Sequence, residues 1–115
     1  MIRKVIERSI RSITLHYRGN DEYVIRIDVD YTRFWPNGET HDYVKSIESD
    51  YDVCHLLDIP MTSYKEKLLK EFNGFLCNDY ETSINGFNCY FKSEEDCMKA
   101  VDWLNSILVM KKLTG

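Results

Sequence analysis

Two aspartates on one expected strand are the first residues in this sequence that could do chemistry. Asp28 and Asp30 lie two positions apart within the segment 23–31, so their carboxylates would share one side of the strand, roughly 7 Å apart. Such a pair could help to hold Mg²⁺, which prefers carboxylates together with water and substrate phosphates. A restriction-type nuclease would also need an acid-x-lysine sequence on a neighbouring strand, and no expected strand carries one. Metal-dependent hydrolysis is therefore an alternative, beside the simpler interpretation of a solvated strand face flanked by Arg26.

The cysteines and histidines form no metal or nucleophile motif. The cysteines are separated by 23, 12 and 8 residues, without the close ligand pair that structural zinc sites show. The histidines form neither HxH nor HExxH, so each is interpreted as a surface residue, although a Cys–His pair that meets only in space stays open. We therefore expect no catalytic residue, no metal and no cofactor. The residues concerned are Cys54, Cys77, Cys89, Cys97, His16, His41 and His55.

Charge is spread unevenly along the chain, and this is its most informative global feature. The whole chain has a net charge of −4, whereas residues 1–18 carry +4 and residues 19–58 carry −7. A concentration of like charge in one segment indicates a surface with a directed electrostatic potential.

The acidic segment predicts a face that could imitate nucleic acid. Three acids fall at alternate positions, starting at the last residue of an expected strand at 42–48. If that strand continued to residue 52, all three would lie on one face, near the first aspartate pair. Successive carboxylates would then lie about 6.7 Å apart, close to the phosphate spacing along one strand of a nucleic acid. Such a face could occupy the basic groove of a nucleic-acid-acting enzyme; the alternative is an ordinary solvated surface. The five carboxylates are Asp28, Asp30, Glu48, Asp50 and Asp52.

A second candidate contact lies at the expected turn after segment 23–31. Arg33, Phe34 and Trp35 precede Pro36-Asn37-Gly38, which places two large aromatics and an arginine beside a tight turn. Trp and Arg are residue types that often dominate interface energy. Phe34 could instead pack inward on the sheet, whereas Trp35 beside Pro36 is harder to bury. We therefore expect either a partner anchor or local packing at this tip.

The first half of the chain predicts an α-β-β-β arrangement. Apolar residues recur near helical spacing at the start, which favours an amphipathic helix, although the isoleucines leave an extended strand open. Strict alternation then predicts strands separated by turns that contain Gly or Pro-Asn-Gly, and these form an antiparallel meander. The expected elements are a helix at 2–9 and strands at 13–18, 23–31 and 42–48.

The second half predicts α-β-β-α. The sequence S-Y-K-E at 63–66 is a capping box that starts a helix, and Asn73-Gly74 would end it. A hairpin is expected at 80–84 and 87–91 around Asn85-Gly86. The last helix begins near Ser93, and its apolar face is broad enough to need cover from two sides. The fold class is therefore α+β, a three-stranded antiparallel meander plus a hairpin packed against two or three helices.

Length and composition predict one domain over residues 1–115. With 43 % hydrophobic residues, a chain of this size can form a core without disulfides. No stretch reaches the ~18 apolar residues that a membrane span needs, and charges interrupt the apolar run at the N-terminus, unlike in a signal peptide. We therefore expect a cytoplasmic protein with reduced thiols and no membrane contact.

These features favour a protein-binding module over an enzyme. In general profile the chain resembles the counter-defence proteins that phages use against CRISPR and restriction nucleases, although no motif carries the resemblance. It implies a stoichiometric inhibitor of a nucleic-acid-acting enzyme, of the anti-CRISPR or anti-restriction kind, that binds protein and not nucleic acid. Two alternatives stay open: a small metal-dependent hydrolase using Asp28 and Asp30, and a homo-oligomeric structural protein that dimerises through the last helix.

Overall fold

The computed structural model describes residues 6–76 and 88–114. Its central sheet is formed by strands in which apolar and polar residues alternate. Strands β1 (Ile6–Gly19), β2 (Glu22–Phe34) and β3 (Thr40–Ile47) form an antiparallel sheet in the order β1-β2-β3. In the middle strand, Ile25, Ile27 and Val29 are buried on what we call the inner face. The residues between them lie on the opposite, outer face because successive side chains of a strand alternate. The α+β class and the three-stranded meander are confirmed.

The first element is a strand, and the helix predicted at 2–9 is wrong from Ile6 onward; residues 1–5 lie outside the described part. The strand that the sequence left open is the observed form. The pairing of β1 with β2 shifts between Ile10 and Ser12, which marks a bulge at Arg11. This extra residue brings Ile10 and Ile13 to the same buried face, although a regular strand would place them on opposite faces. The bulge therefore explains why the isoleucines imitate helical spacing.

The chain after β3 turns into a helix that sequence reasoning missed. β3 ends at Ile47, and α1 (Asp50–Leu57) begins after Ser49 in the N-cap position. The continuation of the strand to residue 52 is therefore wrong. Asp50 and Asp52 lie in the first helical turn, where carboxylates interact favourably with the positive end of the helix dipole.

The second helix, α2 (Met61–Lys70), begins earlier than the predicted capping box. Pro60 occupies the N-cap position and no side chain caps the helix, so the cap assigned to Ser63 is wrong. Proline is tolerated there because the first helical turn needs no amide donor. Tyr64 and Leu68 are buried as predicted, and the expected Glu66–Lys70 pair is present, with 2.7 Å between Oε1 and Nζ.

A short hairpin and a long helix complete the fold. β4 (Phe75–Leu76) pairs with β5 (Cys89–Tyr90), and Phe91 bridges to Tyr23 at the margin of β2. β5 falls within the predicted strand 87–91, whereas the predicted strand 80–84 and its turn lie outside the described residues. The last helix, α3 (Glu94–Thr114), begins directly after Ser93, close to the predicted start. The Ser93 Oγ accepts a hydrogen bond from the Asp96 amide at 3.3 Å.

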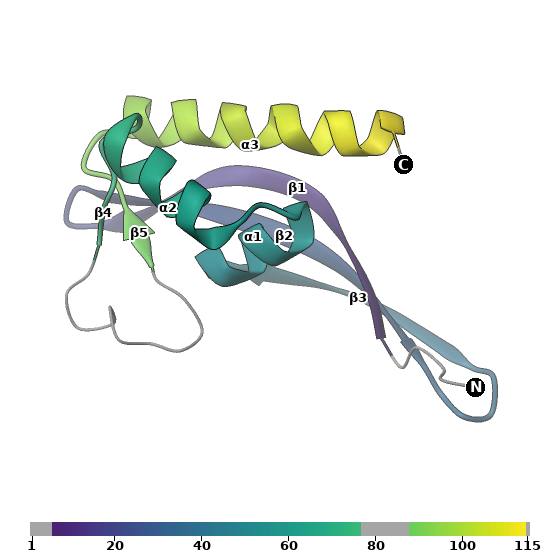
Figure 1. Ribbon diagram of the computed structural model, residues 1–115. Helices are drawn as coiled ribbons and strands as arrows, with labels where there is room; N and C mark the ends of the chain where they lie inside the picture. Colours follow the sequence, from purple (N-terminus) through teal and green to yellow (C-terminus); the bar gives the residue numbers. More distant parts are fainter. Residues whose placement is uncertain (1–5, 77–87, 115) are drawn as a thin grey trace.

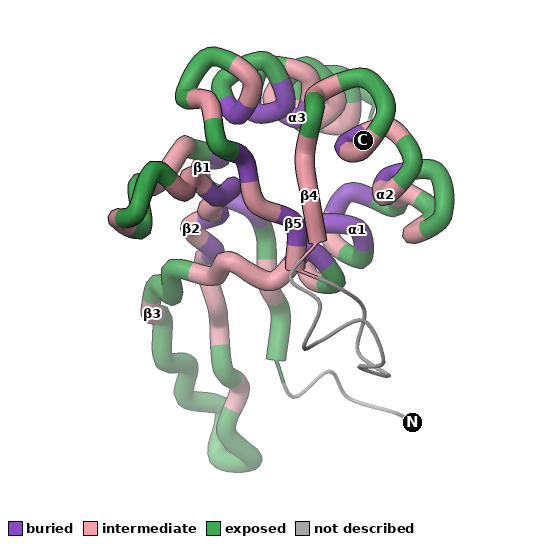
Figure 2. The backbone as a smooth tube through the Cα atoms, turned by 90° about the vertical axis from the view of Figure 1, so that its left-hand side faces the viewer, coloured by how far each residue is buried: buried purple, intermediate pink, exposed green. Residues whose placement is uncertain are grey.

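The helices cover only part of the sheet. In Figures 1 and 2 the helices gather on one side, and the far end of the β2–β3 hairpin projects beyond them. We call residues 31–45 the arm. The molecule is accordingly elongated, with extents of 48 × 33 × 26 Å. The core lies between the inner face and the helices, and α3 contributes Cys97, Ala100, Val101 and Leu104 to it. No described helix is long and apolar enough to cross a membrane.

Gly74 is expected to be intolerant of a side chain. A Cβ at this position would lie 2.5 Å from Cys89 Sγ and 3.1 Å from the Leu68 carbonyl oxygen. We expect Gly74→Ala to lower the free energy of unfolding by about 1–3 kcal/mol, the usual cost of overpacking. Urea denaturation measures it. Cys89→Ala removes the closest atom, so the double variant should be less destabilised than the sum of the two single variants. Strict additivity would contradict this contact.

Candidate functional site

The first predicted aspartate pair lies on the outer face of the sheet, but each carboxylate already has partners. Asp28 accepts hydrogen bonds from Ser46 Oγ at 2.6 Å and Ser12 Oγ at 3.3 Å. Asp30 forms an ion pair with Arg11, whose Nη2 lies 2.8 Å from its Oδ1. The bulge in β1 places Arg11 there. The two carboxylates therefore share a face, as the sequence indicated, within a local network of hydroxyls and a guanidinium.

Glu48 reaches the same face from the end of β3. Its Oε2 lies 3.7 Å from Arg26 Nη2 and 3.9 Å from His16 Nε2. This Oε2 and Arg26 Nε are buried without a hydrogen-bond partner. Glu48 and Arg26 therefore attract each other as charges, at a separation longer than a hydrogen bond. The outer face therefore contains arginines among its carboxylates.

The other two predicted acids leave this face. Asp52 sits on α1, where its Oδ1 lies 3.1 Å from Arg8 Nη1 on β1. Asp50 is only 3 % exposed and is inaccessible to a macromolecular partner. A single face of five carboxylates is therefore not formed: the structure brings Asp28, Asp30 and Glu48 together and separates the helical pair from them.

The buried carboxylate of Asp50 joins three elements. Its Oδ1 accepts a hydrogen bond from the Tyr64 hydroxyl of α2, and its Oδ2 accepts one from the Cys89 amide of β5, both at 2.7 Å. Burial away from water disfavours the charged form and raises the pKa of Asp50 to about 7, although both hydrogen bonds oppose this shift. Asp50 is thus a structural residue that titrates near neutral pH.

The described thiols are poor nucleophiles. Cys54, Cys89 and Cys97 are buried and free. Burial, reinforced by the charge of Asp50, raises the pKa of Cys54 and that of Cys97 each to about 12, and the pKa of Cys89 is raised still further. The reactive species of cysteine is the thiolate, so these thiols stay protonated and unreactive at neutral pH.

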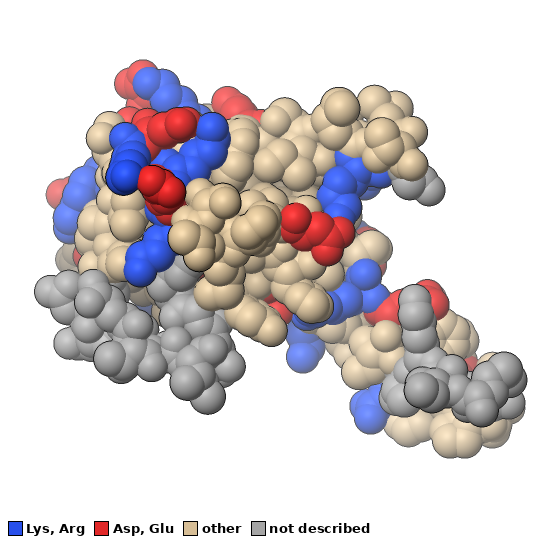
Figure 3. Space-filling model, viewed as in Figure 1, with Lys and Arg blue, Asp and Glu red and all other residues tan. Residues whose placement is uncertain are grey.

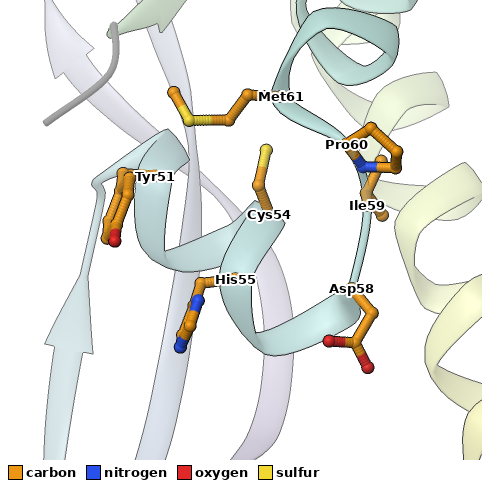
Figure 4. A pocket seen from close by; sticks show the side chains of 7 residues that line it. All are labelled: Tyr51, Cys54, His55, Asp58, Ile59, Pro60 and Met61. Atoms are coloured by element: carbon orange, nitrogen blue, oxygen red, sulfur yellow. The ribbon is translucent and has the colours of Figure 1, made fainter.

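A shallow pocket between α1 and α2 contains the best-placed cysteine and histidine. It has a volume of about 370 Å³. In Figure 4 the Cys54 side chain points toward Met61, whereas His55 points to the other side of the helix, where its ring stacks on Tyr51. The two groups therefore do not form a nucleophile–base pair. Within residues 6–76 and 88–114, no group of three or more His, Cys, Asp or Glu side chains could hold a metal ion.

The arm carries an aromatic cluster on its inner face. The Tyr31 and Tyr43 rings face each other across β2 and β3, with centroids 5.1 Å apart and planes 6° apart. His41 stacks on Tyr43 at 5.7 Å, and Lys45 Nζ lies 5.6 Å from the Tyr31 centroid. Sequence reasoning missed these residues, because the pairing of Tyr31 with Tyr43 depends on a register that the sequence does not fix. The signal that could have indicated this cluster was the presence of a tyrosine on each of two adjacent expected strands.

The tip of the arm presents the predicted aromatic anchor. Trp35 is 45 % exposed, and the Arg33 guanidinium lies 4.7 Å from its ring centroid. The turn is fixed by hydrogen bonds from the Trp35 amide to the Glu39 carbonyl at 2.9 Å and from the Gly38 amide to the Trp35 carbonyl at 3.0 Å. Arg33 is exposed and Phe34 half-buried. In Figure 3 the part of the lower right that grey atoms leave visible is mostly tan, with a few charged side chains.

Comparison with known proteins adds no relative. No family model matches the chain, and neither a curated protein nor a solved structure is similar to it. Its function is therefore argued from the geometry of its own residues.

The buried carboxylate predicts a stability that depends on pH. Between about pH 4 and pH 7 the folded chain keeps a proton on Asp50 that the unfolded chain has lost, so the unfolding free energy falls as pH rises through this window. Asp50→Asn imitates the protonated acid, since its amide can donate to Tyr64 while its oxygen accepts from the Cys89 amide.

We expect the wild type to lose up to about 4 kcal/mol relative to Asp50→Asn between pH 4 and pH 7. Urea denaturation of both proteins across this pH range measures the difference between their unfolding free energies. The contributions of all other titrating groups are common to both proteins and cancel in this difference. A constant difference would contradict the raised pKa.

Proposed function

We propose that this chain is a protein-binding module that contacts its partner through the arm. The observation that carries the proposal is the exposed Trp35 at the tip, held in place by Arg33. Trp, Tyr and Arg are enriched among residues that dominate binding energy, especially where a partner buries them fully. The tip and the aromatic cluster together present all three residue types.

The arm is also ordered before it binds. The stacked Tyr31 and Tyr43 rings and the hydrogen bonds of the turn restrict the side chains and the backbone. Binding costs free energy when it must immobilise flexible groups, so an arm that is already ordered retains more of its contact energy. This supports binding to a partner groove or pocket that accepts an aromatic anchor.

The narrower hypothesis, inhibition of a nucleic-acid-acting enzyme by an acidic face, is a second proposal. It is supported by the outer face, where Asp42 joins the three remaining predicted carboxylates. Of the described residues, two arginines lie among these carboxylates. The excess negative charge would steer the protein toward a basic groove. The residues of this face are Asp28, Asp30, Asp42 and Glu48, with Arg11 and Arg26.

Removal of the anchor tests the proposed function. We expect wild-type protein, used as bait in a lysate of the cell that produces it, to retain a specific protein that Trp35→Ala loses, because the indole supplies the central contact. Tyr51→Ala is the matched control, since Tyr51 is a similarly exposed aromatic, at 41 %, on α1. The proposal fails if wild type and Trp35→Ala retain the same proteins in the same amounts.

The acidic face has a separate test. If it binds a basic groove, the captured complex should weaken steeply with added salt, and Asp28→Asn/Asp30→Asn should reduce both the affinity and this salt dependence. Glu94→Gln/Asp102→Asn changes the charge equally on α3 and serves as the control. Equal effects of the two double variants would show that only net charge matters.

A further inference from the structure

Strand β3 is an edge strand, and within residues 6–76 and 88–114 no other strand pairs with its outer side. It is the last strand of the sheet, and none of its eight residues is fully buried. Figure 2 shows it at the margin of the molecule, mostly exposed. Long exposed edges are unusual in natural proteins because their free amides and carbonyls can pair with another strand.

The backbone groups at this edge can be assigned from two flanking hydrogen-bonded pairs. Tyr23 exchanges amide–carbonyl bonds with Phe91, and the Trp35 amide bonds the Glu39 carbonyl. Both pairs lie on the β3 side of β2, and hydrogen-bonded positions alternate along a strand. The odd-numbered residues of β3 therefore bond to β2, as in the pair Tyr31–Tyr43. The even-numbered residues, including Val44, direct their amides and carbonyls to the free edge.

The polar side chains of β3 do not shield these groups. Ser46 Oγ donates to Asp28 at 2.6 Å, and Asp42 Oδ1 accepts from Thr32 Oγ1 at 2.7 Å. Lys45 lies against the tyrosine rings, with Nζ 5.6 Å from the Tyr31 centroid. All three side chains therefore turn back toward β2. A lysine that extends past an edge protects it, but this one is held over the sheet.

We propose that β3 pairs antiparallel with β3 of a second copy of this chain, with Val44 opposite Val44 of the second copy. Only registers that oppose two even-numbered residues satisfy the free amides and carbonyls. In this register the half-exposed valines meet at the two-fold axis. Tyr43 faces Lys45 of the second copy, which repeats the cation–aromatic contact within each chain. Asp42 faces the uncharged Ser46 of the second copy.

Neighbouring registers are less favourable. The next allowed register arises when one strand slides by two residues, which moves the two-fold axis by one residue. In one direction this slide opposes Lys45 to Lys45 of the second copy. The slide in the other direction opposes Tyr43 to Tyr43 of the second copy, a favourable aromatic pair, but it also opposes His41 to Lys45 and the Asp42 carboxylate to Val44. A further slide opposes Asp42 to its own counterpart. Like charges directly opposite each other destabilise a sheet. The strand is therefore most complementary to itself with Val44 at the two-fold axis, which argues for a second copy rather than an unrelated strand.

This inference goes beyond the proposed function and depends on different atoms. It uses the backbone edge of β3, whereas the observation that carries the proposed function is the Trp35 side chain at the tip. The dimer would carry two arms on one continuous sheet. Two linked arms bind a repeated or symmetric partner more tightly than one arm does. Trp35→Ala should therefore still dimerise, so failure of one proposal leaves the other standing.

Sedimentation velocity over a wide range of concentration tests the dimer. We expect the wild type to form dimers, and Val44→Pro to weaken dimerisation by more than about tenfold, because each copy loses the amide donor at the axis. Proline is tolerated at that position in the monomer, since this amide makes no bond to β2. Val44→Lys, which opposes two like charges, is the second variant and should have the same effect.

Val44→Thr and Val109→Lys are the controls and should dimerise like the wild type. Val109 is 55 % exposed on α3, so loss of the dimer in Val109→Lys alone would assign it to the last helix and overturn the proposal. A wild type that stays monomeric at the highest concentration would also overturn it.

Disulfide trapping tests the register. Facing residues that do not exchange backbone hydrogen bonds have Cα atoms about 4.5 Å apart, within the range of a disulfide. A mixture of Tyr43→Cys and Lys45→Cys should therefore form a cross-linked heterodimer on mild oxidation, while Tyr43→Cys alone should not. The wild type controls for the native thiols. Cross-linking of Tyr43→Cys with itself, at a rate equal to that of the mixture, would contradict the proposed register.

Discussion

The buried carboxylate of Asp50 is the constraint on which the arrangement of this protein depends. Two hydrogen bonds hold it to Tyr64 on α2 and to the Cys89 amide on β5, so one side chain fixes the start of α1 against two other elements. A carboxylate without such partners would be costly to bury. By drawing the chain inward directly after β3, this contact ends the strand at Ile47 and directs the helices across the inner face of the sheet.

The exposed surfaces follow from that inward turn. The helices pack over the near part of the sheet, and the arm, with its stacked Tyr31 and Tyr43, extends beyond them. Among the described strands none pairs with the outer edge of β3, because the chain leaves it for the interior. The two surfaces proposed to bind, the aromatic tip and the free edge, are thus both consequences of where the core ends.

Sequence reasoning identified elements that are governed by local patterns and missed those set by contacts distant in sequence. The alternation in β2 and the capped start of α3 depend on neighbouring residues, and both were predicted. The bulge at Arg11 changed the spacing of buried isoleucines so that β1 resembled a helix. The carboxylate of Asp50 looked like a surface charge because Tyr64 and Cys89, which bury it, are distant in sequence. Trp35 was found by its residue type, whereas the Tyr31–Tyr43 pair depends on strand register.

The most direct test of this account is the titration of the Asp50 carboxyl carbon followed by NMR. If the side chain lies in the dry interior with the two partners described, its chemical shift should change with a midpoint near pH 7, far above that of the exposed carboxyl groups in the same spectrum. A midpoint near pH 4, the ordinary value for aspartate, would mean that Asp50 faces water and would contradict the inward turn from which the arm and the free edge follow.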